Sequence, residues 1–102
     1  MSELVRICTR AELPAEGHAK EFDLGNRAVC LANIAGTVSA VDNVCPHRGG
    51  PLGEGMIENG KLVCPWHAWE FDVATGECIT VPGTNVAVYP LTMQGDDVLA
   101  EL

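Results

Sequence analysis

The stretch CPHRGGPLGEG, residues 45–55, contains Cys45 and His47 with one residue between them, and a second pair, Cys64 and His67, follows in CPWH at 64–67. Thiolate and imidazole are both common metal ligands. Between the pairs lies Asn59-Gly60, a dipeptide typical of a tight hairpin that folds the second pair back toward the first. Four ligands can therefore converge on one centre, either a tetrahedral zinc ion or an iron–sulfur cluster.

The glycines that follow the first pair favour the cluster. Gly49, Gly50, Gly53 and Gly55 have no Cβ atom, so the backbone can approach an inorganic cluster and direct N–H groups at its sulfides. A zinc ion that already has four side-chain ligands has little need of such a loop. A zinc-stabilised structural domain remains the alternative.

The two motifs, Cys-x-His in CPHRGGPL and Cys-x-x-His in CPWHAWEFD, resemble those of the Rieske iron–sulfur proteins. The likeness is close over residues 44–91, and it extends to the whole chain in length and strand pattern. It implies one Rieske-type [2Fe–2S] cluster. In that arrangement Cys45 and Cys64 bind one iron through sulfur, and His47 and His67 bind the other through ring nitrogen.

The resemblance also implies a reduction potential. Two neutral imidazoles leave the oxidised site uncharged, which raises its potential into a window of roughly −150 to +300 mV. High-potential respiratory members carry an extra cysteine pair and hydroxyl donors beside the cluster. The matching positions here are Gly50, Trp66, Trp69 and Phe71, which supply neither a thiol nor a hydroxyl. We therefore expect a potential near the low end of the window.

Other segments are expected to lie beside the cluster. The sequence VPGT at 81–84 resembles the third, proline-containing loop that covers the cluster in this family, although it also fits an ordinary turn. Trp66 and Trp69 could shield the cluster or form a docking surface, and plain core packing is expected for at least one of them.

The remaining cysteines and histidine have no assigned role. Cys8 and Cys30 lie among apolar neighbours in predicted strands, so they are expected to be small buried side chains. Cys78 follows a turn, and partial exposure is expected. His18 lies in the polar segment AEGHAK, where a solvated loop side chain is the simplest interpretation.

Outside the motifs, the chain reads as a series of short strands. Runs rich in β-branched residues are separated by glycines and prolines, and they are LVRIC, RAVCLANI, TVSAV, KLVC, NVAVYPL and DVLAEL. The glycines in IAGTV, ENGK and VATGEC indicate tight reversals. In RAELPAEGHAK, Pro14 and Gly17 limit any helix to a turn. We predict an all-β fold, a small Rieske-type antiparallel sandwich or barrel with a two-loop cluster-binding tip.

This fold is predicted as one domain over residues 1–102, with a cluster-binding subdomain at about 43–84. Five cysteines are an odd number, which argues against a disulfide framework. The stretch MSELVRICTRAEL lacks the apolar block of a signal peptide, and no segment is long and apolar enough to span a membrane. A cytoplasmic location is therefore expected.

The charge of the chain narrows its possible partners. Fourteen acidic residues against six basic ones give a formal net charge of −8, which disfavours nucleic acid and anionic membranes. The same charge could attract a basic protein surface or serve solubility alone.

The predicted function is a soluble one-electron carrier, a Rieske ferredoxin, and not an enzyme. With His47 and His67 assigned to the cluster, only His18 is left, so the two-histidine iron site of an oxygenase cannot be built from this chain. We expect electrons to come from a flavoprotein reductase and to pass to a terminal oxygenase, in a ring-hydroxylating dioxygenase system, with transient docking near His47 and His67. The small subunit of an assimilatory nitrite reductase is the alternative.

Overall fold

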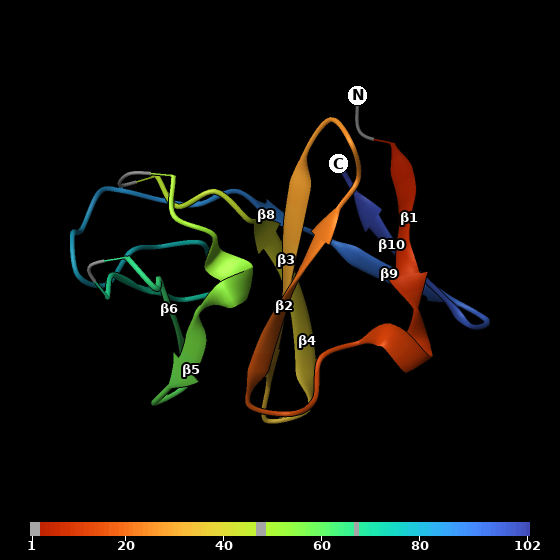
Figure 1. Cartoon of the computed structure of the whole chain (residues 1–102), viewed down its shortest axis with the longest axis horizontal. Coiled ribbons are helices and arrows are strands. Elements are labelled where there is room, and N and C mark those ends of the chain that lie inside the picture. The colour runs from red at the N-terminus through yellow and green to blue at the C-terminus, as the bar shows by residue number, and fades with distance from the viewer. Residues whose placement is uncertain (1–2, 47–48, 67) are drawn as a thin grey trace.

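The computed structural model describes residues 3–46, 49–66 and 68–102. All strand pairs within these ranges are antiparallel, and they form three sheets with the orders β1-β10-β9, β2-β3-β4-β8 and β5-β6-β7 (Figure 1). The predicted all-β antiparallel class is confirmed.

The elements are β1 (Leu4–Thr9), the 3₁₀ turn η1 (Arg10–Glu12), β2 (His18–Asp23), β3 (Ala28–Ile34), β4 (Thr37–Asp42), the 3₁₀ turn η2 (Leu52–Glu54), β5 (Met56–Glu58), β6 (Lys61–Val63), β7 (Glu70–Phe71), β8 (Val88–Tyr89), β9 (Leu91–Gln94) and β10 (Asp97–Glu101).

The four-stranded sheet lies in the middle of the molecule and is covered on both faces. Alternate residues of β3 belong to two separate cores: Val29 and Leu31 pack with residues of β1 and β10, whereas Cys30 and Ala32 pack with the segment that carries η2, β5, β6 and β7. Figure 1 shows these two groups of strands on opposite sides of β2, β3 and β4. Successive side chains of a strand point to opposite faces of the sheet. The sequence of a strand that is covered on both faces is therefore a nearly continuous run of apolar residues. This is why AVCLAN lacks alternation.

Tight turns join the strands where the sequence predicts them. Asn59 and Gly60 have φ values of 51° and 75°, and Ala35 and Gly36 have 54° and 89°. Positive φ at both central residues is the signature of a type I′ hairpin turn, whose twist matches that of the flanking strands. The first of these turns joins β5 to β6, the strand that leads directly into Cys64.

Four strands were missed by the prediction, namely β2, β5, β7 and β9. In β2, only Ala19 and Phe22 are even half-buried, so its sequence HAKEFD shows no apolar run. His18 is exposed as predicted, but it begins β2 and does not lie in a loop. The other three strands have two to four residues, too few for a period to be visible.

The η2 turn attaches the cluster-binding segment to the central sheet. A Cβ atom at Gly53 would lie 2.5 Å from the backbone nitrogen of Glu21 in β2, so only glycine allows this approach. Among the described residues, no helix has the length and hydropathy needed to cross a lipid bilayer.

Candidate metal centre

The first motif lies in a tight loop between β4 and η2. The N–H of Cys45 donates to the carbonyl of Gly50 at 2.9 Å, and the N–H of Gly49 donates to the carbonyl of Cys45 at 2.8 Å. Gly49 adopts φ 77°, a left-handed conformation that glycine reaches without strain. These two bonds, to different glycines, hold the backbone N–H and carbonyl of Cys45 in place.

The second motif lies between β6 and β7. The N–H of Cys64 donates to the carbonyl of Trp69 at 2.8 Å, which closes the loop, and the N–H of Trp66 donates to the Sγ atom of Cys64 at 3.4 Å. This bond directs a backbone donor at a sulfur atom that is a candidate metal ligand.

The two loops meet at Gly50. A Cβ atom at this position would lie 2.9 Å from Sγ of Cys64 and 3.1 Å from the ring of Trp66, closer than ordinary van der Waals contact. Cys45 and Cys64 are each 1% exposed and belong to the same buried core. The structure therefore brings the two predicted cysteines together. The other predicted ligands, His47 and His67, lie outside the described residues.

Asn43 supports the first loop, and the sequence prediction missed it. Its side chain is buried, and Oδ1 accepts a 2.7 Å hydrogen bond from the N–H of Gly53, while its carbonyl accepts from the N–H of Leu52 at 2.8 Å. An Asn between the end of a strand and a Gly-rich loop is a common turn-stabilising signal, and it was available in the sequence. Asn43 thus links the end of β4 to η2, across the loop that holds Cys45.

The other three cysteines are buried, and no disulfide joins any of the described cysteines. Burial of Cys8 and Cys30 agrees with the prediction, and desolvation raises the pKa of Cys30 to about 12. Desolvation also raises the pKa of Cys8. The expected partial exposure of Cys78 is wrong, since this residue is 0% exposed in the core that contains both motif cysteines.

A third loop packs close to Cys78. The N–H of Cys78 donates to the carbonyl of Thr84 at 2.9 Å, and the N–H of Thr84 donates to the carbonyl of Val81 at 3.2 Å. Val81 packs against the same core as the motif cysteines. Figure 1 shows residues 79–86 at the same end of the molecule as the two motif loops. This loop shields Cys78 from solvent. The sequence immediately around Cys78 does not predict that burial, because the loop is placed by its packing against the core.

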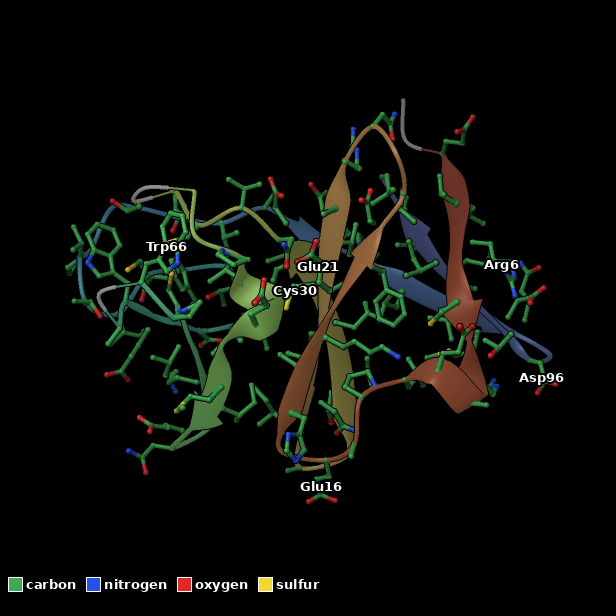
Figure 2. All side chains as sticks on the ribbon, in the orientation of Figure 1. Arg6, Glu16, Glu21, Cys30, Trp66 and Asp96 are labelled. Atoms are coloured by element: carbon green, nitrogen blue, oxygen red, sulfur yellow. The ribbon has the colours of Figure 1, made fainter. Side chains whose placement is uncertain are left out.

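The end of the molecule that carries the motif loops exposes large apolar side chains. Trp66 is 49% exposed, Val44 52% and Ile79 43%, whereas Trp69 is half-buried against the core. Figure 2 shows the ring of Trp66 at this end, far from Asp96 at the opposite end of the longest axis. The two tryptophans therefore differ, one facing solvent and one packing.

Comparison with known proteins identifies the family. The pattern of the Rieske [2Fe-2S] domain matches residues 3–90. The chain belongs to the Rieske [2Fe-2S] domain family. The cofactor of this Rieske chain is a Rieske-type [2Fe–2S] cluster, so the zinc alternative is not supported.

Two relatives are ferredoxins. The Rieske chain is 32% identical, over 92 residues, to the ferredoxin component of a naphthalene 1,2-dioxygenase system from Pseudomonas aeruginosa, covering 89% of this chain and 88% of the relative. The solved ferredoxin of carbazole 1,9a-dioxygenase from Nocardioides aromaticivorans IC177 is 28% identical with a TM-score of 0.82, and the match covers 97% of each chain.

A third similarity concerns the fold alone. A solved chain from Mycobacterium tuberculosis, described as the small subunit of an NADH-dependent nitrite reductase, has a TM-score of 0.84 at 23% identity, covering 100% of this chain and 96% of that one. The identity is too low to carry more than the architecture.

The described residues fit the family's cluster. Two buried cysteines from contacting loops provide soft sulfur donors, and Gly50, which has no Cβ atom, lets the loops approach more closely than any side chain would allow. The N–H of Trp66 provides a donor to one of the sulfurs. This donor set suits an iron–sulfur cluster.

Proposed function

We propose that this Rieske chain is a one-electron carrier that accepts electrons from a flavoprotein reductase and passes them to a terminal oxygenase, in a ring-hydroxylating dioxygenase system. The observation that supports this most directly is the match to a naphthalene 1,2-dioxygenase ferredoxin component over 88% of that protein's length. In such a system the chain is an electron-transfer component and the catalytic reaction takes place on its partner.

The proposed ligands are Cys45 and Cys64 through sulfur, and His47 and His67 through ring nitrogen. The spacing of the two motifs supports this set, as do the burial and proximity of the two cysteines. When bound, the cluster supplies a site that accepts and releases one electron. We propose that the chain forms a single domain over residues 1–102, with the cluster-binding subdomain at about 43–84, because both cores share the central sheet.

The protein surroundings set the potential. Around Cys64, the described hydrogen-bond donor is the backbone N–H of Trp66. Phe71, at a position where high-potential members carry a hydroxyl, is fully buried and apolar. Fewer donors to sulfur stabilise the reduced form less, so we propose a potential near the low end of the roughly −150 to +300 mV window.

Docking is proposed at the end that carries the motif loops, near His47 and His67. Exposed Trp66, Val44 and Ile79 lie in or beside these loops, and an aromatic residue such as Trp66 often dominates the energy of an interface. A carrier must leave one partner before it meets the next, so a small interface with weak affinity suits the role. The net charge of −8 would raise the encounter rate with basic partners.

Single-turnover transfer tests this function. Two equivalents of the chemically reduced chain are mixed with the terminal oxygenase of a naphthalene 1,2-dioxygenase system, naphthalene and O2, because dihydroxylation consumes two electrons, and reoxidation of the chain is followed by visible absorption. We expect reoxidation together with formation of the dihydroxylated product, and slower transfer for Trp66→Ala than for Trp69→Phe. Transfer only to a sirohaem nitrite reductase, with none to an oxygenase, would instead support the small-subunit alternative, which at present rests on a shared fold.

A further inference from the structure

A groove runs along the side of the second motif loop, and Cys64 is the member of the proposed ligand set that borders it among the described residues. It has a volume of about 240 Å³, and its lining includes Glu54, Met56, Glu58, Val63, Pro65 and Ala68, together with Gly55 and Cys64. The lining comes from η2 and β5 on one side and from the residues around Cys64 on the other. In Figure 1 these segments lie at the same end of the molecule.

The groove has apolar walls and two acidic residues. Met56 is 56% exposed, and Pro65 and Ala68 are exposed beside it, so the apolar wall of the groove is open to a partner. Glu54 and Glu58 are both exposed and lie two residues on either side of Met56. Among the described residues, the ion pair joins Arg6 to Asp97. Neither Glu54 nor Glu58 therefore forms an ion pair with a described basic residue.

This combination matches one kind of occupant. An arginine or lysine side chain has an aliphatic stem that packs on apolar surface and a cationic head that pairs with carboxylate. The volume is below the roughly 300–1,000 Å³ typical of small-molecule sites, which suits one inserted side chain better than a free ligand. Methionine and arginine are also enriched in protein interfaces.

We propose that the groove binds a long basic side chain, arginine or lysine, from the surface of a protein redox partner. Because the groove borders Cys64, the inserted side chain would fix the partner directly beside the second motif loop. This inference rests on the proposed carrier function, to which it adds the chemistry of one partner residue and its place on this chain.

The first test uses n-butylguanidinium chloride as the probe and does not depend on electron transfer. The chain is labelled with ¹³C in its methionine methyl groups, and the oxidised protein is titrated at constant ionic strength. We expect a saturable shift of the Met56 resonance, while the resonance of Met93, on β9 in the β1-β10-β9 sheet, stays unchanged. Equal shifts at both methionines, or none at Met56, would overturn the proposal. A shift at Met56 with Mg²⁺ but none with butylguanidinium would also overturn it, in favour of a cation site.

Charge variants make the test specific. The double variant Glu54→Gln/Glu58→Gln removes both carboxylates of the groove. One exposed charge pair changes a binding constant by a factor of about 1.5 to 5. Loss of two such pairs should therefore weaken the binding of butylguanidinium about 2- to 25-fold. The control Glu16→Gln/Asp96→Asn removes the same charge at two exposed positions that lie away from the motif loops in Figure 2, and it should bind like the wild type. Equal weakening in both variants would mean that the effect is one of net charge, against the proposal.

The second test measures reoxidation of the reduced chain by the naphthalene 1,2-dioxygenase terminal oxygenase at low ionic strength. The rate constant should fall about 2- to 25-fold for Glu54→Gln/Glu58→Gln and much less for the control. If the wild type transfers no electrons to any oxygenase, the carrier function fails, while the butylguanidinium result still reports on the groove. If transfer is normal in both variants, the groove proposal fails and the carrier function stands.

Discussion

Gly50 is the point where the two cysteine loops touch, and Gly50→Ala tests whether that contact matters for the cluster. The added methyl group would lie 2.9 Å from Sγ of Cys64 and 3.1 Å from the Trp66 ring. To reach an ordinary contact of about 3.4 Å with the new methyl group, Sγ of Cys64 must move by about 0.5 Å. A displacement of this size is as large as the error in ligand position that a preorganised site tolerates, about 0.5 Å. Overpacking of this kind costs about 1–3 kcal/mol.

Two quantities follow from this displacement. At about 4–8 °C per kcal/mol for a chain of this size, the apparent Tm should fall by about 4–24 °C. Disturbing the groups that orient a metal ligand commonly costs about 10- to 100-fold in affinity, so iron should be lost to a chelator that much more readily than from the wild type. The measurements are thermal unfolding followed by circular dichroism, and iron retained per chain after timed exposure to the chelator.

The matched control is Gly95→Ala, in the turn between β9 and β10. Gly95 has φ 59°, and no atom lies within 4 Å of a Cβ built there, so the substitution adds backbone strain without contact. We expect a modest loss of Tm and normal iron retention. If Gly50→Ala keeps the iron retention and the Tm of the wild type, cluster binding does not depend on the close approach of the two loops, and the reasoning is refuted.

Three further predictions concern residues around the site. Asn43→Ala leaves the buried N–H of Gly53 without its acceptor and should lower the free energy of unfolding by about 1–3 kcal/mol, measured by denaturant titration; no loss would mean that another group replaces Oδ1. Burial raises the pKa of Cys30 to about 12, from 9.0, so the unfolded chain loses this proton first as pH rises. Stability should therefore be full below pH 9 and fall by about 1.4 kcal/mol per pH unit from there to about pH 12, and that decline should be smaller in Cys30→Ala. His47→Cys or His67→Cys should shift the potential toward the about −400 mV of all-cysteine ferredoxins, as measured by redox titration, and an unchanged potential would remove that histidine from the ligand set.

Local sequence signals predict the site better than the layers around it. The convergence of Cys45 and Cys64 followed from the motif spacing and the Asn59-Gly60 hairpin, because both act over a few residues. The glycine loop was expected to permit a close approach, and Gly50 is where that approach occurs. These features are encoded in short segments that specify their own conformation.

The parts that were missed depend on contacts between distant segments. Strand β2 is polar and forms because β3 provides a partner, so its sequence gives no periodic signal. Burial of Cys78 depends on the third loop, whose position comes from packing against the core. The groove between Met56 and Ala68 requires the β5–β6 hairpin and the second loop to lie together, which no single stretch of sequence states.

The ligand set can be tested most directly by electron–nuclear double resonance on the reduced protein, prepared with ¹⁵N-labelled histidine. The account predicts acid-labile sulfide in amounts equal to iron and a rhombic electron-spin resonance signal coupled to two histidine nitrogens. One coupling should disappear in each of His47→Cys and His67→Cys, and both should persist in His18→Asn. A protein that contains zinc without sulfide, or a signal without histidine nitrogen coupling, would contradict the assignment of Cys45, His47, Cys64 and His67.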